Sequence, residues 1–97
     1  MAKAIKDNKC LVPVEYLRGT WMFNVAAGAT ESETFELSGN YPDNLVVVTS
    51  PNVDNGTDIT DVVIRGYVDD GNGSVTIEVT NNGSSAIDGL NVNFVVL

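Results

Sequence analysis

The chain has 97 residues, of which 43% are hydrophobic and 19% are charged, which is the size and composition of one ordinary globular domain. Its formal net charge of −8 at pH 7 argues against nucleic acid and anionic membranes as partners, because both require a concentrated basic surface. The sequence has no histidine and a single cysteine, Cys10, which excludes an internal disulfide and leaves little basis for catalysis, so we expect no enzymatic activity.

Positive charge is concentrated at the N-terminus. Residues 19–97 carry one base and eleven acids, a net charge of −10. Residues 1–18 carry two acids and four bases, a net charge of +2, and the bases are Lys3, Lys6, Lys9 and Arg18. We therefore predict a basic N-terminal arm over residues 1–18 and a separate acidic domain over residues 19–97.

The first nine residues, MAKAIKDNK, begin with bases but have no apolar stretch behind them. This is not the pattern of a secretory signal, so we expect synthesis and folding in the cytoplasm. No apolar run in the sequence approaches the length that spans a bilayer.

The first half of the chain predicts short strands without strong periodicity. Cys10–Val14 contains a proline, which restricts it to an edge strand or an extended approach to the domain. Thr20–Val25 places Trp21 in phase with Phe23, which favours a Trp21 side chain packed in the core. Glu33–Leu37 alternates between polar and apolar residues and is a further strand.

The second half predicts strands more strongly. Leu45–Thr49 is apolar on both faces, which indicates a central strand or a strand covered by a neighbouring subunit. Three segments alternate with the period of a half-buried strand: Val62–Val68, Ser74–Thr80 and Asn91–Val96. Six or seven short strands without a helical period predict an all-β fold. We expect an antiparallel β-sandwich over residues 19–97, jelly-roll-like or immunoglobulin-like, with an extended N-terminal arm.

Polar turn residues join two of these strands. Asp69–Gly73 (DDGNG) is predicted as a five-residue hairpin loop. Its oxygen-bearing side chains, Asp69, Asp70 and Asn72, also resemble part of a calcium loop. Turn chemistry explains the same residues more simply, so we assign no metal site and no cofactor, and calcium binding stays an open question.

Two segments, Ser50–Asp61 and Asn81–Leu90, are predicted as longer loops. Long loops on a rigid scaffold are common places for ligand binding. If the chain binds a ligand, the candidate residues in these loops are Asn52, Asp54, Asn55, Asn82 and Ser84.

The arm is the candidate contact with a larger partner. A lysine at every third position suits an extended segment that lies over an acidic surface. The candidate contact residues are Lys3, Lys6, Lys9, Leu11, Val12 and Arg18. Because Leu45–Thr49 needs cover, we also expect a homo-oligomer, with a trimer favoured, and the interface candidates are Val46, Val48 and Tyr67.

The segments LVVVTSPN, VVIRGYV and GSVTIEVTNNGSSAIDGLNVNFVVL, all within Leu45–Leu97, resemble small β-rich virion proteins of tailed bacteriophages. In those proteins a strand ending in Ser-Pro leads to a strand with a Gly/Ala-Tyr-Val core. A Val-x-Ile/Val-x-Val strand ending in Asn follows, and then a terminal apolar strand. The resemblance implies a head decoration protein, a head fibre or a tail-fibre knob, often trimeric. It supplies no catalytic residues, and the N-terminal half resembles no family.

These observations predict a structural virion protein. The specific expectation is a capsid decoration protein that docks on the phage head through its N-terminal arm. Its partner would be the major capsid protein or another virion protein, without nucleic acid or membrane. The alternatives are a receptor- or glycan-binding knob of a head or tail fibre, and a non-viral β-sandwich binding module.

Overall fold

Six antiparallel β-strands make up the regular secondary structure of the described part of the chain. The computed structural model describes residues 14–53 and 56–97, and no helix occurs among them. The strands are β1 (Leu17–Val25), β2 (Thr30–Glu36), β3 (Val47–Asn52), β4 (Val62–Asp69), β5 (Ser74–Asn81) and β6 (Ile87–Val96). The prediction of an all-β antiparallel fold is confirmed.

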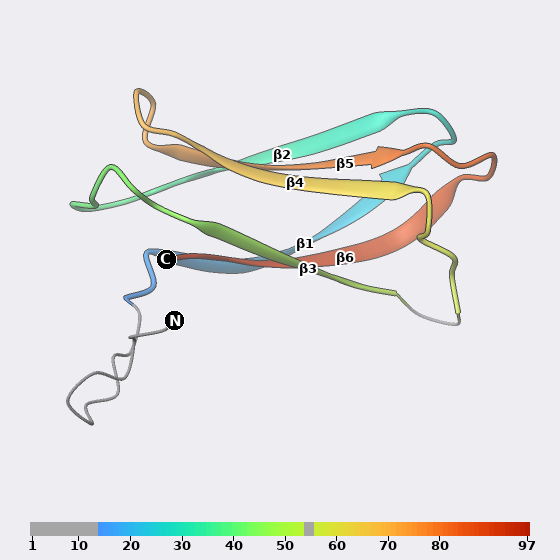
Figure 1. Ribbon diagram of the computed structural model, residues 1–97, viewed down its shortest axis with the longest axis horizontal. Coiled ribbons are helices and arrows are strands. Elements are labelled where there is room, and N and C mark those ends of the chain that lie inside the picture. The colour runs from blue at the N-terminus through green and yellow to red at the C-terminus, as the bar shows by residue number, and fades with distance from the viewer. Residues whose placement is uncertain (1–13, 54–55) are drawn as a thin grey trace.

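The strands form two three-stranded sheets that face each other. One sheet has the order β1-β6-β3 and the other has the order β2-β5-β4, so β6 and β5 are the central strands. Figure 1 shows the sheets as two layers. The chain changes sheet at every connection except the hairpin between β4 and β5. This arrangement is β-sandwich-like.

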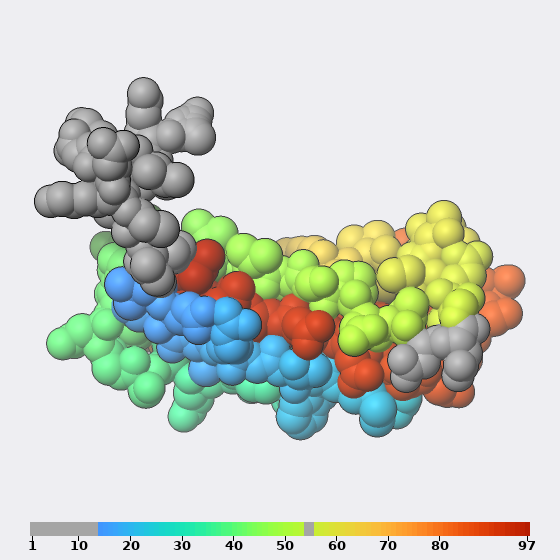
Figure 2. Space-filling view, turned by 90° about the horizontal axis from the view of Figure 1, so that it is seen from below, coloured from blue at the N-terminus to red at the C-terminus, as the bar shows by residue number. Residues whose placement is uncertain are grey.

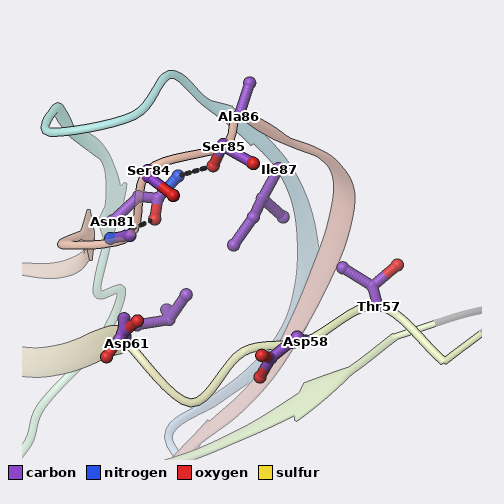
Figure 3. A pocket seen from close by; sticks show the side chains of 10 residues that line it. Thr57, Asp58, Asp61, Asn81, Ser84, Ser85, Ala86 and Ile87 are labelled. Atoms are coloured by element: carbon purple, nitrogen blue, oxygen red, sulfur yellow. Dashed lines mark hydrogen bonds between the residues drawn. The ribbon is translucent and has the colours of Figure 1, made fainter.

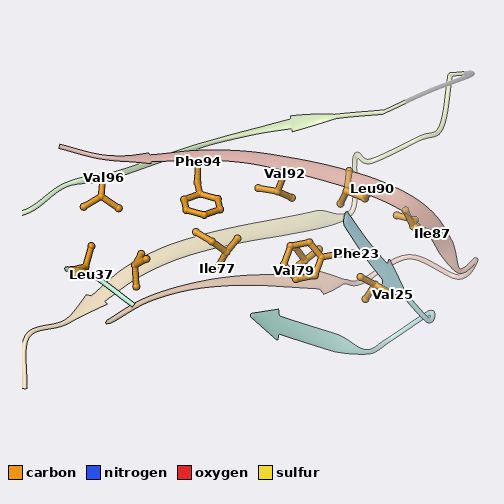
Figure 4. Close-up of a cluster of buried hydrophobic side chains, with 11 residues drawn as sticks. Phe23, Val25, Leu37, Ile77, Val79, Ile87, Leu90, Val92, Phe94 and Val96 are labelled. Carbon is orange, nitrogen blue, oxygen red and sulfur yellow. The ribbon is translucent and has the colours of Figure 1, made fainter. Parts of the chain in front are cut away.

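The core lies between the two central strands (Figure 4). β5 turns Val75, Ile77 and Val79 inward, and each of these side chains is completely buried. The buried apolar side chains of β6 are Ile87, Leu90, Val92, Phe94 and Val96. The alternation in the sequence of β5 produces this arrangement, because a strand with one apolar face is stable only when that face is covered.

β3 is an edge strand, so of the two alternatives predicted for Leu45–Thr49 the central strand is wrong, and cover by a neighbouring subunit stays a prediction. β3 pairs with β6 alone. Val47 faces the core opposite the buried Val96, whereas Val48 points outward and is exposed. The edge position also explains why the strand can continue through Pro51, which has no N–H to donate to a neighbouring strand.

The prediction of a loop over Asn81–Leu90 is also wrong. β5 includes Asn81, and β6 begins at Ile87, so the true connection is short. The start of β6 is irregular: its register against β1 shifts, and Gly89 has a φ of 75°. Ile87 and Leu90 are consequently both buried although they are three residues apart. A search for apolar residues at every second position therefore misses this part of the strand. β3 likewise includes the start of the other predicted loop.

Trp21 lies at the side of the sandwich and not in the core, contrary to the prediction. Its side chain is 42% exposed. The ring does point toward the facing sheet, where it meets Phe35 edge-on, with ring centroids 5.7 Å apart and an interplanar angle of 73°. The ring stays partly exposed because β1 is an edge strand and has no further strand beside it.

Gly66 allows β3 and β4 to approach each other closely. It occupies an inward position of β4, opposite Ile77 of β5. A β-carbon at Gly66 would lie 2.6 Å from Cγ1 of Val47 and 3.2 Å from Cγ2 of Thr49, both on β3. The two sheets therefore touch here without room for one additional methyl group.

We expect Gly66→Ala to lower the free energy of unfolding by roughly 1–3 kcal/mol, because the added methyl group must displace packed side chains. Urea unfolding followed by the fluorescence of Trp21 measures this change. Gly71→Ala in the β4–β5 hairpin is the control, since its β-carbon would meet only Oδ1 of Asp69, at 3.4 Å. The control should stay within about 0.5 kcal/mol of the parent chain. Equal losses for both variants would contradict a close contact at Gly66.

Candidate functional site

The two sheets differ in charge. The strands of β1-β6-β3 contain one acid, Asp88, and one base, Arg18. The strands of β2-β5-β4 contain one base, Arg65, and five acids: Glu31, Glu33, Glu36, Asp69 and Glu78. The strong negative charge of the domain is therefore unevenly distributed, and one sheet is nearly free of it.

The outward side chains of β1-β6-β3 form a surface that we call the low-charge face. Figure 2 looks onto this sheet, with β1, β6 and β3 side by side. Amide, hydroxyl and apolar side chains dominate the face, and Oγ1 of Thr20 donates a hydrogen bond of 2.7 Å to Oδ1 of Asn93. A groove of about 310 Å³ lies over it, lined by Arg18, Thr20, Val48, Ser50, Asn93 and Val95, among others.

Of the predicted arm contact residues, Arg18 is the one whose structure is described. It belongs to β1 and pairs with Val95, so the sheet begins before the predicted end of the arm at residue 18. Its guanidinium donates two hydrogen bonds to the Glu15 carboxylate, one of them from Nε at 3.0 Å. These bonds lower the pKa of Glu15 and raise the pKa of Arg18. The other arm candidates lie outside the described residues: Lys3, Lys6, Lys9, Leu11 and Val12.

The predicted subunit-interface residues are all exposed. Val46 is 56% exposed, Val48 47% and Tyr67 41%. They lie on the side of the sandwich formed by β3 and β4, although Tyr67 belongs to the other sheet. Sequence reasoning missed Val63, which is 48% exposed on β4. Val63 lies opposite the core-facing residues in the alternating sequence of β4, and this position could have identified it as an exposed residue.

A pocket of about 230 Å³ lies between residues 56–61 and 82–86, the connections before β4 and before β6. Figure 3 shows Asp58 and Asp61 on one side of it and Ser84 and Ser85 on the other. The two connections are joined where the backbone N–H of Asn82 donates to the carbonyl oxygen of Asp61, at 2.9 Å. The structure thus brings the two predicted ligand loops together.

Of the predicted ligand-loop residues, Ser84 lines this pocket. Asn82 takes part through its backbone, whereas Asn52 ends β3. The remaining two candidates, Asp54 and Asn55, lie outside the described residues.

Asp58 was not among the predicted ligand-loop residues. Its carboxylate accepts hydrogen bonds from both the N–H (2.9 Å) and the hydroxyl (2.5 Å) of Thr60. The side-chain bond and then the backbone bond lower the pKa of Asp58, because both favour its ionised form.

Asn81 closes the base of the pocket and is 1% exposed. Its Nδ2 donates to the carbonyl oxygens of Val25, at 3.1 Å, and Ser85, at 2.9 Å. Its Oδ1 accepts from the N–H of Gly83, at 2.9 Å. Its backbone adds two bonds to the β1–β2 connection, one from its N–H to Ala29 and one to its oxygen from Gly28. This set of bonds fixes the β5–β6 connection, which borders the pocket, and the β1–β2 connection.

The Asp69–Gly73 segment is the predicted hairpin, and Asp69 organises it. Oδ1 of Asp69 accepts from the N–H groups of Gly71 and Asn72, and Oδ2 accepts from Nδ2 of Asn72, at 2.7 Å. The carboxylate thus acts as a turn cap. Across residues 14–53 and 56–97, no group of three Asp, Glu, His or Cys side chains is placed to hold a metal ion.

Within the same ranges, no helix could cross a membrane. Comparison of the chain with protein-family models, with curated proteins and with solved structures finds no match. The assignment of a function therefore depends on the surfaces described above.

We expect Asn81→Leu to lower the free energy of unfolding by about 2–4 kcal/mol. The substitution leaves the buried carbonyl oxygen of Val25 without a partner, and an unpaired buried group costs roughly 1–3 kcal/mol. It also removes the part-buried hydrogen bonds to the carbonyl oxygen of Ser85 and from the N–H of Gly83. Urea unfolding followed by far-UV circular dichroism measures the loss. Asn82→Leu, at the exposed neighbouring position, is the control and should change stability little. A loss below about 0.5 kcal/mol for Asn81→Leu would contradict the role of its side chain.

Asn81→Asp should produce a pH-dependent loss. Burial beside two carbonyl oxygens disfavours an ionised carboxylate, so the pKa of the introduced group should be higher in the folded than in the unfolded chain. The protonated group can still donate one bond, so the deficit relative to the parent should be smallest below the unfolded pKa of about 3.9 and should increase as the pH rises above it. Urea unfolding of both chains at several pH values from about 3 to about 8, a range that brackets the unfolded pKa, tests the direction of this pH dependence. A deficit independent of pH would contradict it.

Proposed function

We propose that this chain is a structural, non-catalytic component of a tailed bacteriophage particle, and specifically a capsid decoration protein. The segment Lys3–Arg18 and the adjoining low-charge face contact the head, and the acidic sheet β2-β5-β4 faces the solvent. The virion is accordingly its proposed location, and the major capsid protein or another virion protein is its proposed partner.

The observation that carries this proposal is the unequal charge of the two sheets. A protein surface that is covered by a partner loses its water, and burying unpaired carboxylates is costly. The strands of β1-β6-β3 offer a surface with one acid, whereas those of β2-β5-β4 carry five. The N-terminal residues lead directly into β1, an edge of the low-charge sheet. The arm and this face can therefore contact one partner together.

The proposed contact also accounts for a stabilising role. A decoration protein that binds neighbouring capsid subunits favours the assembled shell, because anything that binds only the assembled state stabilises it by mass action. The acid-rich sheet, left in solvent, would keep the particle surface negative and soluble.

The strand order supports a jelly-roll type in preference to an immunoglobulin type. The immunoglobulin arrangement places several pairs of consecutive strands side by side within one sheet. Here only the consecutive pair β4 and β5 shares a sheet, and each other connection crosses to the opposite sheet. Jelly-roll domains are frequent in viral particles, which agrees with the proposal by analogy of fold.

A second candidate function is suggested by the pocket between residues 56–61 and 82–86. Ser84 and Ser85 lie across a space of about 230 Å³ from Asp58 and Asp61, so hydroxyl and carboxylate side chains line the same pocket. Hydroxyl and carboxylate groups suit hydrogen bonding to a saccharide. This observation favours a glycan-binding knob of a head or tail fibre as the alternative.

The test uses phage particles purified by density gradient from a lysate of cells that carry the gene. Mass spectrometry should find the chain in the particle fraction, and immunogold electron microscopy should place it on the head. A tagged chain lacking residues 1–9 should be incorporated at least about tenfold less than the tagged full chain, which corresponds to a loss of about 1.4 kcal/mol of binding. Ser84→Ala is the matched control and should be incorporated normally.

Gold label at fibre tips, with cell binding that is lost in Ser84→Ala and kept without residues 1–9, would establish the knob function instead. Absence of the chain from purified particles would overturn both phage functions and favour a non-viral binding module.

A further inference from the structure

Exposed apolar side chains gather on one side of the molecule. Seven large hydrophobic side chains are exposed among the described residues. Four of them lie on or beside the neighbouring edge strands β3 and β4: Val46, Val48, Val63 and Tyr67. A cluster of exposed apolar side chains on a small acidic domain indicates a contact surface.

The four side chains form two patches that point in different directions. Val46 and Val48 lie on the outer face of β1-β6-β3 and form the β3 flank. Val63 and Tyr67 lie on the outer face of β2-β5-β4 and form the β4 flank. β3 and β4 lie against each other at Gly66, so the flanks are on opposite faces of one side of the sandwich.

Charge separates this side from the opposite one. Edge strand β2, on the far side, carries three glutamates, Glu31, Glu33 and Glu36, and charged residues on an edge strand prevent pairing with another chain. β3 carries no charged residue. In the middle of β4 the only charge is Arg65, whose Nη1 lies 3.3 Å from Oε1 of Glu78. The β3/β4 side thus lacks the electrostatic protection that β2 has.

We infer that copies of this chain assemble into a closed ring in which the β3 flank of one copy packs on the β4 flank of the next. The occupant of each flank is a second copy of this chain. This inference does not depend on the proposed attachment to a phage head.

Charge favours this arrangement over a two-fold dimer. Two β4 flanks placed together would also bring together the acid-rich sheets to which they belong, and like charges across an interface oppose binding. Two β3 flanks placed together would leave Val63 and Tyr67 exposed. Contact between unlike flanks sets the β3 flank against the β4 flank and covers all four exposed apolar side chains, and it leaves the β1 and β6 part of the low-charge face free. A contact between two different patches generates a ring when its rotation closes.

Analytical ultracentrifugation of the full chain, from about 1 µM to about 1 mM, tests the inference over the range of weak interfaces. The full chain should form a discrete species of three or more copies. Val48→Glu changes only the β3 flank and Val63→Glu only the β4 flank, and each variant alone should be monomeric. An equimolar mixture of the two should form a one-to-one heterodimer, because one variant keeps an intact β4 flank and the other an intact β3 flank.

Met22→Glu is the matched control, since Met22 is 55% exposed on the same outer face but on β1. It should associate like the parent chain, and circular dichroism should show that all variants are folded. Higher salt should strengthen association, because apolar contact joins two acidic bodies.

The inference would be overturned by a full chain that stays monomeric throughout, by a dimer as the largest species, or by a mixture that forms no heterodimer. Association that disappears with removal of residues 1–9 and weakens in salt would also overturn it, in favour of contact through the basic arm.

Discussion

The hydrogen bonds of Asn81 are the constraint on which the rest of the structure depends. Asn81 belongs to β5, yet its side chain reaches Val25 at the end of β1 in the other sheet. The same residue fixes the β1–β2 connection through its backbone and the β5–β6 connection through Ser85 and Gly83. Because it is fully buried, these bonds have no competition from water. One residue therefore determines how the two sheets meet at this end and keeps the β1–β2 and β5–β6 connections in place.

The sequence was sufficient for the central strand β5 and for the outward positions of β4. Both follow from strict alternation, which arises when one face of a strand is buried and the other is wet. Alternation could not predict where β6 begins, because the irregularity at Gly89 puts Ile87 and Leu90 on the same face. It also could not place β3 at an edge, because both apolar faces of Leu45–Thr49 looked equally suited to burial. An edge strand pairs with one neighbour and a central strand with two, and strand pairing depends on residues that are distant in the sequence.

The candidate surfaces show the same division. Exposure of Tyr67 could be predicted from its position opposite the core face of β4, whereas Val46 and Val48 were interface candidates because Leu45–Thr49 is apolar on both faces. The low-charge face could not, because it appears only when β1, β6 and β3 are known to share a sheet. Counted along the chain, the acids look scattered. Counted by sheet, the acids that lie within strands gather on β2, β4 and β5 and leave the other sheet with Asp88 alone.

The glycine at position 66 has a consequence for the surface of the subunit. On the β3/β4 side the sheets touch where Gly66 has no side chain, whereas on the β1/β2 side the rings of Trp21 and Phe35 stand between the sheets. A larger side chain at position 66 would have to displace Val47 and Thr49 of β3. The exposed Val48 lies between these two residues on the same strand, so it would move with them. The absence of one β-carbon on β4 thus fixes the position of an apolar surface on the other sheet, which Gly66 itself does not touch.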